Sequence, residues 1–207
     1  MGILDYVEAT ASKLLYSVRG HDDQVFTKSP AFKDIPTPNI TVTSPECGPS
    51  GSNLKIEHTQ FGAERFPHLE WTSTLPNVKE YILIVQDVDA PLPTPILHGS
   101  YYALPSTRMQ VSATDFEAGG GAGGGAENVL KGGFKHGKNL RGTRYSGPKP
   151  LLGHGPHHYW FQVIALSETV EGGKLSARAT KAELEAAVVG KVIGWGAWIG
   201  VYEKKWE

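Results

Sequence analysis

The first regular apolar pattern in the chain lies at its N-terminus. Apolar residues recur there every three or four positions, as on one face of a helix: Ile3, Val7, Ala11, Leu14, Leu15 and Val18. The pattern predicts an amphipathic helix over residues 3–19, within an N-terminal helical segment 1–20 that Gly20 ends. We expect this helix to pack against the rest of the chain as a lid or a brace.

A second helix is predicted near the C-terminus. Thr180 and Glu183 have the spacing of a capping box, in which each side chain bonds the backbone N–H of the other residue. The helix is expected to run to about Val189 and to end at Gly190. The stretch that follows, VIGWGAWIGVYEK, alternates small and large residues and predicts a strand in close contact with another backbone segment.

Between the helices, runs of β-branched and aromatic residues predict strands. They are NITVT, LKIEH, HLEWT, YILIVQDVDAP, GSYYAL and YWFQVIAL. The run YILIVQDVDAP, residues 81–91, is apolar up to its two aspartates and predicts a strand buried on both faces. Because strands dominate and turns recur about every ten residues, the pattern favours a mainly antiparallel β fold with helices near the two ends.

The composition of the chain narrows its class. It has 207 residues and a net charge of −1, so we treat 1–207 as one globular domain with no general attraction to nucleic acid. No segment is apolar over the length of a membrane span, and the N-terminus lacks the pattern of a signal peptide. The single cysteine, Cys47, cannot form an internal disulfide and is interpreted as an incidental loop thiol. We expect a cytoplasmic protein.

Two loops separate the later strands. Residues 117–127, EAGGGAGGGAE, are expected to be flexible, because glycine loses the most conformational entropy on ordering. Residues 131–149 contain no acidic residue, and their basic residues are Lys131, Lys135, Lys138, Arg141, Arg144 and Lys149. This basic segment is either a solvated loop or a local positive field that attracts an anionic ligand.

Aspartates and histidines gather at the ends of the predicted strands. Asp87 and Asp89 are two residues apart, so both are expected on one face, as turn residues or as carboxylates shared with a protonated histidine. His98 opens the next strand, and His157 and His158 open a later one within GHGPHHYWF. Adjacent residues of a strand face opposite ways, so only one histidine of this pair can face a given site.

A metal site is the competing interpretation of these aspartates and histidines, together with His154. No H-x-x-x-H spacing supports it, and neither a dinucleotide-binding nor a P-loop motif is present. The sequence therefore predicts neither a metal nor a cofactor. It also lacks the G-x-S-x-G motif of a committed nucleophile.

Three motifs occur in the order and spacing of a known family. DVDAP, HGSYYALP and GKNLRGTRYSGPKPLLGHGPHHYWFQVIAL resemble signatures of the phosphatidylethanolamine-binding protein family, also called the Raf kinase inhibitor protein family. The resemblance is strongest over residues 80–170, and the N-terminal helix and the glycine insertion resemble its fungal branch. It implies an antiparallel β-sandwich of Greek-key type, with an N-terminal and a C-terminal helix.

The resemblance also implies a ligand pocket. The residues carried over to it are Asp87, Asp89, Pro91, His98, Tyr145, Pro148, Pro150, Gly155, His157 and Tyr159. The Ala90–Pro91 peptide is expected to be cis, as it is in the family. Two positions depart from the family pattern: Val88 replaces a proline, and His158 replaces an arginine next to the key histidine.

Two functions follow from the resemblance. The first is binding of a small anionic ligand, a phosphate, phospholipid head group or carboxylate, with possible modulation of a kinase or a serine carboxypeptidase. The second is a role in fungal secondary metabolism, as an enzyme or an auxiliary protein acting on carboxylate or anhydride intermediates of the maleidride type. In an enzyme, the catalytic candidates are Asp87, Asp89, His98 and His157.

Overall fold

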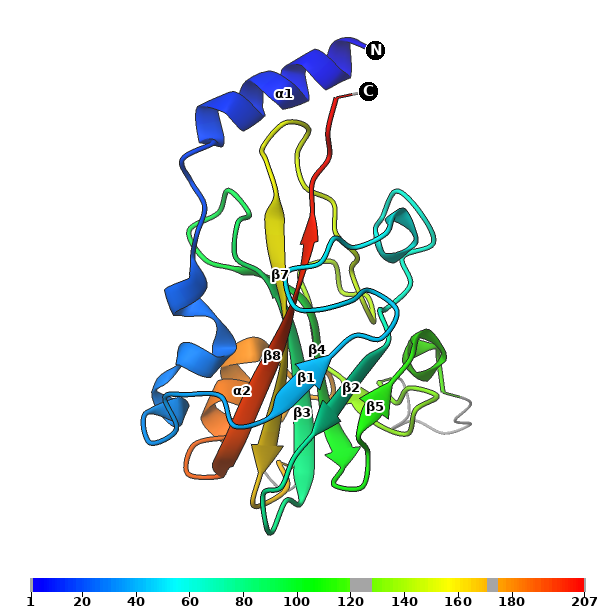
Figure 1. The fold of residues 1–207 in the computed structure, drawn as a ribbon. Helices are drawn as coiled ribbons and strands as arrows, with labels where there is room; N and C mark the ends of the chain where they lie inside the picture. The colour runs from blue at the N-terminus through cyan, green and yellow to red at the C-terminus, as the bar shows by residue number, and fades with distance from the viewer. Residues whose placement is uncertain (1, 120–127, 171–174, 207) are drawn as a thin grey trace.

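The computed structural model describes residues 2–119, 128–170 and 175–206 (Figure 1). Its helices and strands are α1 (Ile3–Leu15), the 3₁₀ turns η1 (Asp22–Gln24), η2 (Phe26–Lys28) and η3 (Pro30–Phe32), β1 (Thr41–Thr43), η4 (Ile56–His58), β2 (Leu69–Thr72), β3 (Glu80–Asp87), β4 (Ile96–Pro105), β5 (Gln110–Val111), η5 (Ala113–Phe116), β6 (Lys135–His136), β7 (His157–Leu166), α2 (Lys181–Ala187) and β8 (Val192–Tyr202). The mainly β fold with a helix near each end is therefore confirmed.

The strands form two antiparallel sheets. One has the order β1–β2–β5, and the larger one has the order β6–β4–β3–β7–β8. The central strand β3 directs Tyr81, Leu83 and Val85 into one apolar core. It directs Ile82 and Ile84 into a second core on its other face. Every residue of β3 is buried, so the predicted strand with two buried faces is confirmed.

The smaller sheet packs on one face of the larger one, in front of it in Figure 1. The glycines of β8 allow this close approach, because a Cβ atom at Gly196 would lie 2.0 Å from the carbonyl oxygen of Ile40. A Cβ atom at Gly200 would lie 2.8 Å from the side chain of Leu54. The close backbone contact predicted from the alternation of small and large residues is therefore confirmed.

The opposite face of the larger sheet is covered by α2 and the 3₁₀ turns. Leu184 of α2 packs in the same core as Ile82 and Ile84. The predicted capping box is present: the Glu183 N–H donates to Thr180 Oγ1 at 3.2 Å, and the Thr180 N–H donates to Glu183 Oε2 at 2.7 Å.

The N-terminal helix is shorter than predicted, because it ends at Leu15 and not at residue 19. The Leu15 carbonyl accepts from the Val18 N–H at 2.8 Å, which closes a tighter turn. It also accepts from the ring of His154 at 3.1 Å. Arg19 then leaves the helix axis to reach Asp89. α1 lies across the end of the molecule where β7 begins (Figure 1).

One further prediction, a strand at LKIEH, is wrong, and another concerns residues that the structure does not describe. LKIEH is not a strand: Ile56–His58 form a 3₁₀ turn, in which the Thr59 N–H donates to the Ile56 carbonyl. Its buried positions are Leu54 and His58, a spacing that strand alternation also produces. Residues 120–127 of the predicted glycine-rich loop lie outside the described residues. Within the described residues, no helix has both the length and the apolar character that crossing a membrane requires.

Candidate ligand site

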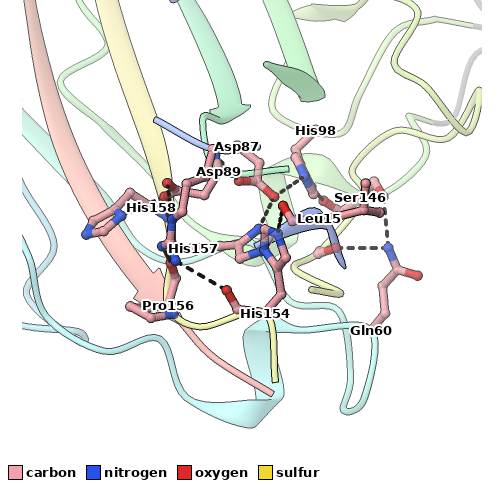
Figure 2. Close-up of polar contacts among 12 residues, drawn as sticks. Leu15, Gln60, Asp87, Asp89, His98, Ser146, His154, Pro156, His157 and His158 are labelled. Atoms are coloured by element: carbon pink, nitrogen blue, oxygen red, sulfur yellow. Dashed lines mark hydrogen bonds and ion pairs between the residues drawn. The ribbon is translucent and has the colours of Figure 1, made fainter. Parts of the chain in front are cut away.

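The candidate site lies where β3 ends and β7 begins. The antiparallel register places Asp87 opposite Tyr159 and brings the Asp87 carboxylate to His157, whose Nδ1 donates to Asp87 Oδ2 at 2.8 Å. His98 comes from β4, and its Nε2 lies 4.0 Å from the same Oδ2 (Figure 2). These side chains are buried, and so is His154 beside them. We call Asp87, His98, His154, His157 and Tyr159 the histidine cluster.

His154 extends the cluster into a hydrogen-bonded chain. Its Nδ1 lies 2.8 Å from His157 Nε2, and its Nε2 donates to the Leu15 carbonyl. Because a carbonyl oxygen only accepts, His154 carries a proton on Nε2, and burial lowers its pKa and keeps the ring neutral. His154 Nδ1 and His157 Nε2 share one hydrogen bond, so a continuous chain links the Asp87 carboxylate to the Leu15 carbonyl.

His98 has a different protonation state. Its Nδ1–H donates to the Ser146 carbonyl, and burial lowers the pKa of the ring although Asp87 lies nearby. The neutral ring therefore leaves Nε2 without a proton. Within the described residues, this buried Nε2 has no hydrogen-bond partner, so its lone pair is unused.

Two buried tyrosines have unused donors, and one of them, Tyr159, lies next to His98. Among the described residues, the buried Oη atoms of Tyr159 and Tyr145 have no hydrogen-bond partner. Burial, and then the charge of Asp87, raises the pKa of Tyr159 well above its ordinary value, and burial also raises the pKa of Tyr145. Both groups therefore stay protonated as O–H donors. The ring of Tyr159 lies edge-on to His98, with the ring centroids 5.2 Å apart.

Asp89 is used differently from Asp87. Its Oδ2 accepts from the Nδ1 of His158 at 2.7 Å and from the His158 N–H at 2.8 Å. Burial alone would favour the neutral acid, but these hydrogen bonds and the charges of His158 and Arg19 lower the pKa of Asp89. Its own N–H donates to Asp87 Oδ1 at 2.9 Å, which links the two aspartates. Figure 2 shows His158 pointing away from the ring of His157.

The segment after α1 covers the cluster. Arg19 donates to Asp89 Oδ1 at 3.3 Å and to the carbonyls of His154 and Pro156. A Cβ atom at Gly155, whose φ is +88°, would lie 2.8 Å from Arg19 Nη1, so this glycine admits Arg19. The ring of Tyr16 lies edge-on to His154, with the centroids 6.2 Å apart. The N-terminal segment thus closes one side of the site.

The remaining candidates line the neighbouring loops. Pro148 and Pro150 are buried, and the Pro148 carbonyl accepts from the Gln60 N–H at 3.0 Å. Pro91 is partly buried beyond the end of β3. The expected cis peptide before it is wrong, since no peptide bond between described residues is cis. The turn is closed instead by the Asp89 N–H on Asp87 and by the Leu92 N–H on the Ala90 carbonyl, at 2.7 Å.

The basic segment contributes less positive charge than its composition suggests. Arg141 pairs with Glu64 at 2.9 Å, and Lys131 pairs with Glu117 at 3.0 Å, both near the surface.

Cys47 is not an activated nucleophile, because burial raises the pKa of its thiol.

The sequence analysis considered His154 only as a candidate metal ligand, and it did not identify Arg19 as a site residue. The two glycines that flank His154 were a usable signal for a closely packed loop. No local signal marked Arg19, because its contacts span 70 residues or more of the sequence.

Comparison with known proteins agrees with the fold and the motifs. Residues 44–203 match the family described as "Phosphatidylethanolamine-binding protein". The chain therefore belongs to the phosphatidylethanolamine-binding protein family. The Escherichia coli protein YbcL, described as a member of the mammalian PEBP family, shares the fold with a TM-score of 0.67 at 24% identity, covering 80% of this chain and 98% of YbcL.

Two fungal relatives are similar over nearly the whole chain. "Phomoidride biosynthesis cluster protein B" of Talaromyces stipitatus is 43% identical over 99% of this chain and 84% of its own length. A protein of the same name from an unclassified fungal species is 40% identical over 99% of this chain and 98% of its own length. A "UPF0098 protein" of Aquifex aeolicus is 32% identical, covering 75% of this chain and 84% of the relative.

Proposed function

We propose that this chain binds a small carboxylate- or anhydride-bearing intermediate of fungal secondary metabolism at the histidine cluster and assists a proton transfer on it. The observation that carries the proposal is a pair of polar atoms there: His98 Nε2 and Tyr159 Oη are buried and have no hydrogen-bond partner among the described residues. Buried polar groups without partners are costly, so their retention favours a ligand that pairs with them.

The protonation states define the chemistry of this ligand. The neutral His98 accepts a proton at Nε2, and the O–H group of Tyr159 donates to oxygen. A base and an oxygen-directed donor side by side suit removal of a proton next to a carbonyl. His98 would take the proton, the electron pair would move onto the carbonyl oxygen, and Tyr159 would stabilise the resulting negative charge. The protonated His98 would then return the proton to the product.

The electrostatics favour a carboxylate or a carbonyl compound over a phosphate dianion. Asp87 and Asp89 bring negative charge to the site, and the guanidinium of Arg19 already pairs with Asp89. A dianion would have to approach these carboxylates with little compensation from His98, which burial keeps neutral. A monoanion or a neutral anhydride, hydrogen-bonded by Tyr159, meets less repulsion.

The relatives support the metabolic context. Two proteins named for a phomoidride biosynthesis cluster are 43% and 40% identical to this chain over almost its full length. The second candidate is a phosphate or head-group site that modulates a kinase or a serine carboxypeptidase, and the family description favours it. Both candidates use the same cluster, so one ligand panel separates them.

The test is thermal unfolding with dicarboxylates, tricarboxylates, a cyclic anhydride, phosphate and phosphoethanolamine. A ligand that binds only the folded state raises the melting temperature. We expect stabilisation by the carboxylate or anhydride class, and Tyr159→Phe should weaken that binding by roughly tenfold or more, because a hydrogen bond to a charged group is lost. Tyr6→Phe, at an exposed tyrosine, is the matched control. Stabilisation by phosphate alone, or an unchanged response of Tyr159→Phe, would contradict the proposal.

A further inference from the structure

A second group of reactive side chains lies away from the histidine cluster, between β1 and η4. It consists of Glu46, Cys47 and His58, whose ligand atoms all lie within 4.8 Å of one another. Glu46 and Cys47 lie in a turn closed by the Gly48 N–H on the Ser44 carbonyl at 2.9 Å. His58 is fully buried, whereas the other two are partly exposed, so the group is open to solvent on one side.

The hydrogen bond of His58 Nδ1 orients the imidazole ring so that Nε2 faces Cys47. Nδ1 lies 3.0 Å from the Arg65 carbonyl, which can only accept, so Nδ1 carries the proton. Nδ1 is therefore the nitrogen that faces the backbone, and Nε2 lies 3.6 Å from Cys47 Sγ. A backbone carbonyl bonded to one ring nitrogen is the usual support of a histidine whose other nitrogen binds a metal.

The distances fit a tetrahedral ion. Bond lengths of about 2.3 Å to sulfur and about 2.0 Å to nitrogen place the two donors roughly 3.5 Å apart in a tetrahedral site. The observed Sγ to Nε2 distance is 3.6 Å. Glu46 Oε1 lies 3.8 Å from Nε2 and accepts from the His68 N–H at 2.6 Å, so binding an ion would require it to shift by roughly half an ångström against that hydrogen bond. Glu57 Oε1 lies 3.7 Å from Nε2 and adds a second negative charge.

We propose that Cys47 Sγ, His58 Nε2 and Glu46 Oε1 form a site for a zinc-class divalent cation, with water as the fourth ligand. Sulfur, imidazole and carboxylate are the donors that zinc takes in proteins, while magnesium and calcium take oxygen. The site is connected to the histidine cluster through Gln60, whose Nε2 donates to Ser146 Oγ at 3.0 Å. The Ser146 carbonyl in turn holds His98.

The Arg65 guanidinium would compete with a bound ion for the two carboxylates. Arg65 contacts Glu46 and Glu57, each at 3.4 Å, and its side chain is 44% exposed. A bound ion would displace this guanidinium toward solvent. Arg65→Gln removes the competing charge while it leaves the backbone carbonyl that orients His58.

The experiment is a titration of the tag-free full chain with Co²⁺ and Zn²⁺ after dialysis against chelator. Bound Co²⁺ should give a thiolate charge-transfer band that saturates at one ion per chain, Zn²⁺ should displace it, and Mg²⁺ should not. Cys47→Ser is the primary variant, because a change at the fully buried His58 risks unfolding. It should abolish the band and lower zinc affinity by at least about tenfold. Glu46→Gln should weaken binding as well.

Matched variants exclude other sites. His158→Ala, at a partly exposed histidine of the other group, should leave the band and the affinity unchanged, and Arg65→Gln should bind at least as tightly as the parent. Absence of a thiolate band in the parent would overturn the proposal. So would equal zinc affinity in folded Cys47→Ser, which would assign binding to other histidines, or weaker binding in Arg65→Gln.

Discussion

At the scale of the residue, His98 is held neutral by burial while its Nδ1–H is fixed on the Ser146 carbonyl. Asn at this position can replace the donor but cannot take up a proton. We therefore expect the free energy of unfolding of the parent, relative to His98→Asn, to fall as the pH is lowered. The measurement is urea unfolding of both proteins between about pH 7.5 and 5.5.

The sign of this effect follows from proton linkage. The pKa of His98 in the folded protein lies below its ordinary value of 6.5, so the unfolded chain binds the proton first. The stabilisation is present above pH 6.5 and is lost below it, by at most about 1.4 kcal/mol for each pH unit. A difference between the two proteins that stays constant or grows on acidification would show that His98 is not held neutral.

The residues of the site differ in how far the sequence could predict them. Asp87, His98 and His157 follow from motifs at strand ends, and their positions in the chain are local information. The hydrogen-bonding role of His154 does not, because it depends on the Leu15 carbonyl, 139 residues away. The pairing of Asp89 with His158 was also not predicted, since strand alternation was assumed to continue beyond Asp87, where β3 ends.

At the scale of the element, Arg19 is one of the contacts that attach the N-terminal segment to the site, beside the Glu8 carboxylate on the Leu152 N–H and the Leu15 carbonyl on His154. Its guanidinium reaches Asp89 and two carbonyls of the loop before β7. Arg19→Gln should loosen this attachment, so amide exchange should accelerate in α1 and residues 153–156, while β3 and β7 stay protected. Lys13→Gln, at an exposed position of α1, is the control. Unchanged exchange in Arg19→Gln would mean that other contacts hold the segment.

Local signals predicted some elements better than others. The capping box at Thr180 and Glu183 defines the start of α2 by itself, because its hydrogen bonds are made within one turn. The end of α1 was misjudged, because the tertiary contact of His154 with Leu15 stops an apolar pattern that continues to Val18. LKIEH was misread as a strand because a short run with two buried positions suits either conformation.

At the scale of the whole molecule, the two sheets approach each other at the glycines of β8. Gly196→Ala would place a methyl group 2.0 Å from the Ile40 carbonyl oxygen, a backbone atom that cannot move aside cheaply. We expect a loss of about 1–3 kcal/mol in the free energy of unfolding. Val189→Ala, at a residue that is 63% exposed, should change it by less than about 0.5 kcal/mol. Equal effects of the two substitutions in urea unfolding would refute the close sheet contact.

The sequence could predict the antiparallel class of the fold and the close contact of β8, because both follow from residue size and alternation. It could not predict which segments pair across the two sheets, since pairing depends on the register of strands that are far apart in the chain. The covering of the site by α1 is likewise a property of the assembled molecule, visible only once the start of β7 and the N-terminal segment are seen together (Figure 1).

The central claim is that His98 and Tyr159 meet a ligand at the histidine cluster, beside His157, and imidazole ¹⁵N NMR of the histidine-labelled chain tests it most directly. The free protein should show His98 protonated on Nδ1 only. Titration with the carboxylate or anhydride that most raises the melting temperature should shift His98 Nε2 and the His157 signals, while those of His136, a buried histidine of β6, stay unchanged. A stabilising ligand that leaves both His98 and His157 unshifted would contradict the account.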